Sequence, residues 1–467
     1  HQNRKIRKME ENFDEAEKYF EKAAKSGNNE GMFEYGKIIY PRDPDKAIEF
    51  FEISSNDEGF EKSRNILNAY NILSKVDGFA ELSGEFQIFL LKEFAKVNNN
   101  DDFNYLKKLI IDQKTLKKFY KKNVFQHNSL STILSKFQEI YIGLEFNSDI
   151  YESAIESIQK IKNELKGKET IITVVVTISD RYKTIEKEFG SNSVVNVATI
   201  KGKVKSIGNL VFADCKALKS VSIPISVTSI GESAFENCKS LTNIPLISIT
   251  EIKKRTFYQC ESIPSISMPE IVQSIGDFAF YKCTNLQTLA IPKNTRTIGN
   301  SSFEECTSLD SVVLNVNLNT IGNNAFRGCI NIKKISIPKN VLSIGERSFA
   351  NCESLKTVTF SKKMTTIAKA AFENCQELKK LKNLVNIQVI ESHAFHDCTS
   401  LKQIDLSNVE RIRSSAFHGC SSLESVNITN VYHIGNGTFK GCTSLKEIKL
   451  PECLKEIGSS EFEGCSL

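Results

Sequence analysis

The sequence has 467 residues, which is enough for two or three domains, and it carries 13 cysteines and a formal net charge of +5 at pH 7. So mild a charge requires no polyanionic partner, and the residues given contain no secretory signal peptide and no apolar run long enough to span a membrane. Because unpaired cysteines in this number favour a reducing compartment, we predict a cytoplasmic location, with the cell surface as the alternative. The start at His1 and a stop within a repeat suggest a fragment of a longer protein.

Residues 12–53 carry a weak helical repeat. The segment 16–27 is an amphipathic helix that ends at Gly27, a similar segment begins at Asp45, and a further helix lies between them. The motif Lys/Glu-Ala, Tyr/Phe-Phe, Ala-Ala-x-x-Gly resembles Sel-like helical hairpins, which are related to tetratricopeptide repeats. We therefore expect a partial array of Sel-like repeats over residues 1–60.

Residues 61–168 carry no family motif, and their pattern predicts a further helical region of four or five helices. An apolar stripe over 86–91 is typical of a buried helix face. A basic stretch contains Lys107, Lys108, Lys114, Lys117, Lys118, Lys121 and Lys122. Because leucines and an isoleucine at helical spacing mix with these lysines, we interpret the stretch as a solvated helix face rather than a contact for nucleic acid or acidic lipid.

The next segment begins with an eight-residue apolar run, 171–178, which has the length of a strand and is far too short to span a membrane. Phe189 and Asn192 lie 23 residues before the first Phe and Cys of the repeat described next. We therefore expect residues 170–194 to form a degenerate capping repeat, which shields the end of the core of a repeat array.

A Phe-x-x-Cys pair recurs twelve times, with successive phenylalanines 22 or 23 residues apart. The pairs are Phe212/Cys215, Phe235/Cys238, Phe257/Cys260, Phe280/Cys283, Phe303/Cys306, Phe326/Cys329, Phe349/Cys352, Phe372/Cys375, Phe395/Cys398, Phe417/Cys420, Phe439/Cys442 and Phe462/Cys465. Self-similarity at this period predicts a solenoid, in which each repeat buries its apolar face only against its neighbours. We expect the paired Phe and Cys side chains to form the core of the repeats.

Each repeat predicts one short strand and one turn. Apolar residues follow Cys329 at +3, +6 and +8, and the last two have the spacing of a strand, which Pro338 ends. Five residues before each repeat phenylalanine stands an isoleucine, followed in eight copies by glycine, which is typical of a turn. We expect the stretch from there to the cysteine to form one short helical turn, with the phenylalanine as its buried anchor.

The pattern Leu-x-x-Val-x-Ile-Pro … Ile-Gly-x-x-Ala-Phe-x-x-Cys closely resembles the BspA-like leucine-rich repeats over about residues 195–467. The resemblance implies a right-handed leucine-rich solenoid, of a kind found in surface antigens and adhesins. The expected fold class is thus α+β: an N-terminal all-helical repeat region, then a leucine-rich repeat solenoid over 169–467 in which a parallel β-sheet alternates with short helical turns. Copies at 245–252 and 381–391 depart from the pattern, and we expect them to be bent or loosened.

The thirteen cysteines allow three interpretations. Disulfides between neighbouring rungs are geometrically conceivable, and a zinc site would need ligands clustered at short spacing, which one cysteine per repeat does not provide. We predict instead a ladder of buried free thiols that act as small apolar residues and are inert as nucleophiles. Cys453 lies off the repeat register and is the expected exposed thiol.

His396 and His418 each follow the phenylalanine of adjacent repeats, with His393 and Asp397 nearby. A surface metal patch is one interpretation, and solvated surface histidines are the one that we adopt, so no metal site is predicted. The sequence contains no phosphate-binding glycine loop and no HExxH motif. We therefore predict no catalytic residues and no cofactor.

Exposed strand positions at +4, +5 and +7 after the cysteine are mostly Ser, Thr, Asn, Lys and Gln. The candidate binding face consists of Lys356, Thr357, Thr359, Lys379, Lys380 and Lys382. Because aromatic anchors are few, this face favours a broad polar contact over a dry, high-affinity groove, and a merely solvated sheet face is the alternative.

These patterns predict a non-enzymatic scaffold or adaptor whose leucine-rich surface binds other proteins, with the helical repeats as a second binding module. We expect no nucleic-acid partner and no membrane span within the chain. Two alternatives stay open: a cell-surface BspA-like adhesin or antigen, and the targeting region of a larger enzyme such as a kinase.

Overall fold

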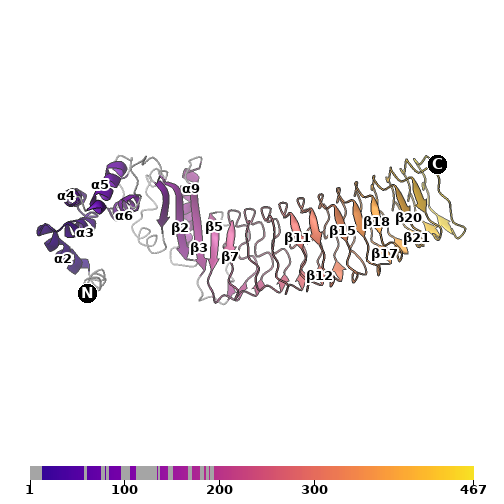
Figure 1. Ribbon diagram of the computed structural model, residues 1–467, viewed down its shortest axis with the longest axis horizontal. Coiled ribbons are helices and arrows are strands. Elements are labelled where there is room, and N and C mark those ends of the chain that lie inside the picture. The colour runs from indigo at the N-terminus through magenta and orange to yellow at the C-terminus, as the bar shows by residue number, and fades with distance from the viewer. Residues whose placement is uncertain are drawn as a thin grey trace. The chain divides into compact units, whose positions relative to one another are not determined.

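The structure is a computed structural model, and it describes residues 13–56, 60–74, 79, 84–95, 106–111, 134, 137–145, 151–166, 171–178, 184–185, 189 and 194–466. The chain divides into two compact units, residues 1–176 and 177–467. The first unit is mainly helical, and the second is a solenoid of parallel strands (Figure 1). A helical N-terminal region followed by a parallel β-solenoid confirms the expected fold class.

The first unit begins with a series of helices, each packed against the next: α2 (Phe13–Lys25), α3 (Asn29–Ile39), α4 (Pro44–Ser55), α5 (Glu61–Leu73) and α6 (Gly84–Ala95). Side chains cap two of them, because Oδ1 of Asn28 accepts a hydrogen bond from the Gly31 amide at 2.7 Å and Oδ1 of Asp43 accepts one from the Lys46 amide at 3.1 Å. The helices predicted within 12–53 are thus present, whereas the resemblance to Sel-like repeats stays a prediction.

Two strands lie within residues 61–168, which we expected to be helical throughout. β1 (Leu106–Ile111) pairs in parallel with β2 (Phe137–Glu145), and α9 (Tyr151–Glu164) follows. The helical expectation is wrong at both strands. In β1 it fails because only the pairing with a segment about thirty residues away makes this stretch a strand. Of the basic stretch, Lys107 and Lys108 therefore lie in a strand. The remaining lysines fall outside the described residues: Lys114, Lys117, Lys118, Lys121 and Lys122.

The strands of the solenoid are short, and all their described pairings are parallel. The longer ones are β3 (Ile171–Ile178), within which the boundary of the two units falls, β5 (Val195–Ile200), β7 (Ser220–Ser222), β11 (Thr288–Ala290), β13 (Ser311–Val313), β15 (Lys334–Ser336), β16 (Thr357–Thr359), β18 (Lys380–Lys382), β20 (Gln403–Asp405) and β22 (Ser425–Asn427). The two-residue strands are β4 (Thr184–Ile185), β6 (Ser206–Ile207), β8 (Ser229–Ile230), β9 (Glu251–Ile252), β10 (Ser274–Ile275), β12 (Thr297–Ile298), β14 (Thr320–Ile321), β17 (Thr366–Ile367), β19 (Val389–Ile390), β21 (Arg411–Ile412), β23 (His433–Ile434) and β24 (Glu456–Ile457).

These strands form two rows. The longer strand of a rung pairs with the longer strands of the neighbouring rungs, and the two-residue strand pairs with the two-residue strands of the neighbouring rungs. β15, β16 and β18 make one sheet, for example, and β17, β19, β21, β23 and β24 make another. Figure 1 shows the two rows running in parallel from β7 to the C-terminal rungs. Partners are 22 or 23 residues apart, such as Thr357 and Lys380, so each rung is one sequence repeat.

A stack of phenylalanine rings fills the core from Phe189 to Phe462. Successive ring centroids lie 4.6 to 6.1 Å apart, and most ring planes are within 16° of parallel. The rings from Phe212 to Phe439 have no exposed surface. Backbone bonds hold adjacent rungs in step, because the amide of each phenylalanine donates to the next rung, as Phe326 does to the carbonyl oxygen of Ser348 at 2.8 Å. The stack is therefore continuous across every repeat.

The cysteine ladder runs beside the rings. All thirteen cysteines are thiols rather than disulfides, and eleven are buried, while Cys465 is half-buried and Cys453 is exposed. From Cys238 to Cys442, each thiol donates a hydrogen bond to the carbonyl oxygen of the phenylalanine one rung back, as Cys329 does to Phe303 at 3.1 Å. The thiol is thus more than the small apolar group that we predicted, because it satisfies a buried carbonyl that alanine or valine would leave without this donor.

Cys215 begins the ladder, and it is a buried free thiol as we predicted. Its side chain has no exposed surface, and its amide donates to the carbonyl oxygen of Phe212 at 3.1 Å, as the amides of the later cysteines do in their own repeats. It differs from them in its position, because the preceding repeat carries Asn192 in place of a cysteine. Cys215 therefore has a neighbouring ladder cysteine, Cys238, on one side only.

The stretch before each cysteine forms a series of turns. In one rung the amide of Arg327 donates to the carbonyl of Asn324 at 3.1 Å, and the amide of Cys329 donates to that of Phe326 at 3.2 Å. Asn324 and Gly328 have φ values of +53° and +72°, and these left-handed residues prevent the turns from merging into a helix.

The glycine after the isoleucine serves close approach between rungs. A Cβ atom at Gly322 would lie 2.6 Å from the carbonyl carbon of Gly299, the equivalent glycine one rung back. A side chain at Gly322 would therefore require this rung and the preceding one to shift.

The copies that depart from the sequence pattern behave differently. Residues 381–391 include ends of β18 and β19, both paired in register, so the expectation of a loosened rung is wrong there. Asn383 adopts φ +66°, and its Nδ2 donates to the carbonyl of Phe360 at 3.3 Å, which anchors the turn without proline or glycine. Near 245–252, a single bridge at Asn243 stands where most rungs have a strand, and the next rung likewise has a single bridge at Ser265.

The residues before the first regular repeat continue the core. Phe189 is buried, and its ring stacks on Phe212 with centroids 4.6 Å apart. Val195, Ile200 and Val204 are also buried, while Asn192 lies outside the described residues. A further rung therefore covers this end of the phenylalanine stack.

Candidate functional site

The candidate binding face lies on adjacent strands of the longer row. β16 and β18 pair so that Thr357 stands opposite Lys380 and Thr359 opposite Lys382. Val358 between the two threonines is buried, so these threonines and the lysines opposite them point away from the core. The lysines are exposed and the threonines half-buried. The two strands therefore bring these four predicted residues onto one surface.

One offset within the repeat holds lysine in four consecutive rungs: Lys333, Lys356, Lys379 and Lys402. The amide of Lys356 donates to the carbonyl of Lys333 at 2.8 Å, and the amide of Lys379 to that of Lys356 at 3.0 Å, so these residues are direct neighbours across rungs. All four side chains are exposed. Together with the strand lysines they form what we call the lysine face, which consists of Lys333, Lys334, Lys356, Lys379, Lys380, Lys382 and Lys402.

Few carboxylates neutralise the lysine face. Lys356 pairs with Glu377 at 3.2 Å and Lys402 with Glu424 at 3.4 Å, and all four side chains are about half exposed or more. Such solvent-screened pairs are worth about 0–1 kcal/mol each. Within the described part of the chain, the other five lysines form no ion pair. The face therefore keeps a net positive charge over four rungs, although the whole chain is only mildly basic.

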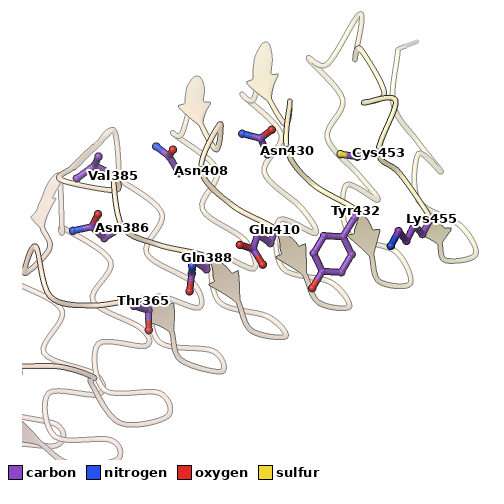
Figure 2. A pocket seen from close by; sticks show the side chains of 10 residues that line it. All are labelled: Thr365, Val385, Asn386, Gln388, Asn408, Glu410, Asn430, Tyr432, Cys453 and Lys455. Atoms are coloured by element: carbon purple, nitrogen blue, oxygen red, sulfur yellow. The ribbon is translucent and has the colours of Figure 1, made fainter.

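A groove follows the row of two-residue strands (Figure 2). Its volume is about 740 Å³, and its lining residues are Thr365, Val385, Asn386, Gln388, Asn408, Glu410, Asn430, Tyr432, Cys453 and Lys455. Nine of the ten come from two columns of the repeat, and Val385 lies beside Asn386. Cys453 takes the place that asparagine holds in the preceding rungs. Nδ2 of Asn430 donates to the carbonyl of Ser407 at 2.6 Å, so this amide ties rungs together as well as lining the groove.

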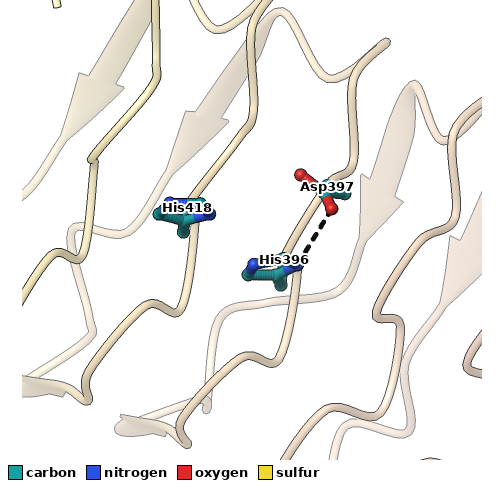
Figure 3. A group of neighbouring side chains, drawn as sticks. All are labelled: His396, Asp397 and His418. Atoms are coloured by element: carbon teal, nitrogen blue, oxygen red, sulfur yellow. Dashed lines mark ion pairs between the residues drawn. The ribbon is translucent and has the colours of Figure 1, made fainter. Parts of the chain in front are cut away.

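The histidine pair lies on the turn that follows the phenylalanines. The rings of His396 and His418 stack with centroids 4.7 Å apart and planes 9° from parallel, and Nδ1 of His396 lies 3.2 Å from Oδ2 of Asp397 (Figure 3). One ligand atom from each of these three residues lies within 4.8 Å of the others. Both histidines are half-buried, so they are less solvated than the sequence led us to expect. His393 lies beside His396, with ring centroids 5.4 Å apart.

The surroundings of His418 favour a neutral ring. Burial lowers its pKa, the neighbouring His396 and Lys440 lower it further, and Asp397 and Glu463 oppose them. Its Nδ1 is shielded from solvent and has no hydrogen-bond partner among the residues that the structure describes. A neutral imidazole with an unpaired nitrogen retains a lone pair that can accept a proton or bind a metal ion.

The buried thiols are poor nucleophiles. Burial raises the pKa of Cys306 and of Cys442 to about 12, and it raises that of Cys329 well above the usual range. At the start of the ladder, burial and then the neighbouring Cys215 raise the pKa of Cys238 in the same direction. Since the thiolate is the reactive form, these thiols with a raised pKa stay protonated and inert near neutral pH.

The sequence contained a signal for the full lysine face that we did not use. Reading one repeat offset down successive rungs, rather than reading along one rung, finds the lysine column at once, because a solenoid places equal offsets side by side. The groove offered a weaker signal, the recurrence of asparagine at one offset.

Among the described residues, none of the helices combines the length and the apolar character that crossing a bilayer requires.

Several solved structures are similar to this chain, whereas no curated protein matches it. A leucine-rich repeat protein from Bacteroides ovatus is 27% identical over 62% of this chain and 84% of its own, with a TM-score of 0.47. A leucine-rich repeat protein from Eubacterium ventriosum is 24% identical over 70% of this chain and 89% of its own, with a TM-score of 0.42. A leucine rich cell surface protein from Faecalibacterium prausnitzii is 24% identical over 60% and 83%, with a TM-score of 0.36.

The family comparison covers the whole solenoid and extends upstream of it. The BspA type leucine rich repeat region matches at residues 147–263, 183–291, 250–379 and 376–467, in six copies. These matches together span residues 147–467, well over half of the chain. The chain therefore belongs to the BspA-type leucine-rich repeat family.

Proposed function

We propose that this chain is a non-enzymatic scaffold or adaptor that binds other proteins through its solenoid, and that the lysine face is the contact surface. The observation that carries the proposal is the run of Lys333, Lys356, Lys379 and Lys402 at one repeat offset. Rungs lie about 4.8 Å apart, so the four ammonium groups follow a line of about 14 Å. Membership of a leucine-rich repeat family supports a binding role in general terms.

The chemistry of this face favours an acidic protein segment. Lysine ammonium groups are flexible point charges, which attract carboxylates over a distance but do not fix them with the paired geometry of arginine. The strand threonines, Thr357 and Thr359, offer hydroxyl groups to a partner backbone. An acidic segment laid across the rungs would gain attraction from several lysines at once, and such charges mainly raise the rate and selectivity of association.

The test uses the full chain as bait in an extract of the cells that make it. We expect the triple variant Lys356→Glu, Lys379→Glu, Lys380→Glu to lose the proteins that the unaltered chain retains, and their binding to weaken with added salt. Three reversed charges at about 0.5 kcal/mol or more each predict a loss of at least about tenfold. The matched control is Lys201→Glu, Lys205→Glu, Lys216→Glu, which changes the net charge equally at exposed lysines outside the lysine face.

The outcomes separate this proposal from its alternatives. Retention of the same proteins by both triple variants would refute the lysine face as the contact surface. Binding of a sulfated polysaccharide such as heparin, with no binding of purified acidic proteins, would instead favour an extracellular matrix ligand.

We also propose a cytoplasmic location, which the presence of thirteen thiols rather than disulfides supports. Asn427 and Asn436 each begin an Asn-x-Thr glycosylation sequon, so a glycan on either residue of the native protein would contradict a cytoplasmic location.

A further inference from the structure

The cluster of His396, Asp397 and His418 joins two rungs at their turns (Figure 3). Both histidines occupy the position after the core phenylalanine, where two other rungs place Tyr258 and Tyr281, which also stack, with ring centroids 4.8 Å apart. The repeat geometry alone therefore explains why the two rings stack. It does not explain why a carboxylate lies against them.

The carboxylate of Asp397 leans toward the rung of His418. A Cβ atom built on Gly419 would lie 2.0 Å from Oδ1 of Asp397, so the carboxylate occupies the space that a side chain at this position would fill. Gly419 has φ +74°, a conformation that glycine adopts without strain. The glycine next to His418 thus makes room for the oxygen atoms of Asp397.

We propose that His396, Asp397 and His418 bind a divalent metal ion of the zinc class, with water completing the coordination. Two imidazole nitrogens and one carboxylate oxygen are a ligand set that borderline ions such as Zn²⁺ prefer, whereas Ca²⁺ and Mg²⁺ prefer oxygen ligands alone. The buried, unpaired Nδ1 of His418 supports the assignment, because a metal ion would give this nitrogen the partner that it lacks.

Metal binding requires a small rearrangement. Zinc bonds to nitrogen or oxygen are about 2.0–2.2 Å long, so two ligand atoms of one ion lie at most about 4.3 Å apart. The present separations reach 4.8 Å, and parallel rings do not aim their nitrogens at a common point. One histidine ring must therefore rotate out of the stack. Because the ligands come from two rungs, the bound ion would cross-link them.

The experiment titrates Co²⁺ and Zn²⁺ into the full chain carrying Cys453→Ser, which removes the exposed thiol as a competing ligand. Cobalt distinguishes the ligands, because thiolate ligands give an intense near-ultraviolet charge-transfer band that nitrogen and oxygen ligands do not. We expect one bound equivalent without this band, and a rise in the unfolding temperature on addition of zinc. Neither effect is expected from Ca²⁺.

The decisive variant is His418→Phe, because phenylalanine keeps a ring for stacking on His396 but has no nitrogen. We expect it to fold as the parent does, by circular dichroism, and to lose at least about a hundredfold in Co²⁺ affinity. Asp397→Asn should weaken binding about tenfold or more. The control is His433→Ala, whose Nδ1 lies 2.6 Å from Glu456 and outside the cluster, and which should leave affinity unchanged.

Three outcomes would overturn the proposal: unchanged cobalt binding in His418→Phe, a thiolate band in the parent spectrum, or equal binding of Ca²⁺. Because the readout is binding of the ion itself, failure here leaves the proposed role of the lysine face unaffected. Success in turn does not depend on any protein partner.

Discussion

Replacing Phe326 by alanine tests how the rungs support one another. The ring has no exposed surface and lies between Phe303 and Phe349, with both centroid distances 5.3 Å and ring planes within 8° of parallel. Its removal leaves a cavity with a ring on each side. The adjacent rungs cannot close this space easily, because backbone bonds such as that from Phe326 to Ser348 fix their separation.

The expected cost is large and local. A buried Phe→Ala change costs about 3–5 kcal/mol, and two stacked ring pairs at about 0.5–1.5 kcal/mol each place this site toward the upper end. A loss of about 4 kcal/mol corresponds to roughly a thousandfold change in an opening equilibrium, at 1.4 kcal/mol for each factor of ten. Because each rung contacts only its neighbours, the loss should be concentrated in the three rungs between 303 and 352.

Native-state hydrogen exchange measures this directly, since long repeat arrays do not unfold as a two-state system. Amides in 303–352 should lose protection by about two to three orders of magnitude, while rungs near Phe235 change little. The control is Phe278→Ala, the same substitution at a half-buried phenylalanine outside the stack. Equal effects of the two variants, or unchanged exchange in 303–352, would refute the stacked core as the source of stability.

Three further outcomes follow from the same packing. Under native conditions iodoacetamide should modify Cys453 first and spare the eleven buried thiols, as mass spectrometry can show, and uniform labelling of all cysteines would contradict the buried ladder. Gly322→Ala should lower the unfolding temperature more than Gly202→Ala. A Cβ atom at Gly322 would lie 2.6 Å from the carbonyl carbon of Gly299, whereas a Cβ atom at Gly202 would have no atom within 4 Å. Equal shifts would count against a close approach of the rungs at Gly322. Burial raises the pKa of the Cys306 thiol to about 12 in the folded protein, whereas in the unfolded chain it is about 8.5. The protonated thiol therefore makes its full contribution to stability below about pH 8.5, and this contribution is lost as the pH rises toward 12. The urea midpoint should therefore fall between pH 8 and 10, less steeply in Cys306→Ala, and a parallel pH profile would exclude this origin.

The solenoid was predictable because its information is repeated. Every rung carries the same Phe, Cys and Ile positions, so one departure such as 381–391 could not hide the fold. The missing glycine and proline did mislead us about the rung at 381–391 itself. There Asn383 supplies the left-handed turn, a role that glycine and proline signals do not reveal.

The strands of the first unit were missed for two different reasons. In β1, Leu106, Leu109 and Ile110 have the i, i+3, i+4 spacing of a helix, and only the distant partner β2 makes this segment a strand. In β2 the signal was present, because Ile140, Ile142 and Leu144 alternate and all three are buried. The first miss reflects non-local pairing, and the second reflects a period that we overlooked.

The candidate site was predicted in part for a related reason. A single-rung reading finds Lys356 and Lys379 as polar surface positions, but the charge of the surface emerges only when rungs are stacked. The contact between Asp397 and the pair of histidines depends on the absence of a side chain at Gly419, which sequence patterns do not express.

The lysine face is tested most directly by a photo-crosslinking amino acid on the solenoid in living cells. It is placed at Thr357, which stands opposite Lys380, or at Ser220, the same repeat offset on β7. We expect discrete adducts with acidic proteins from position 357, lost when Lys379 and Lys380 are changed to glutamate, and none from position 220. Equal adducts from both positions, or adducts from 357 that persist after the charge reversal, would contradict the lysine face as the binding surface.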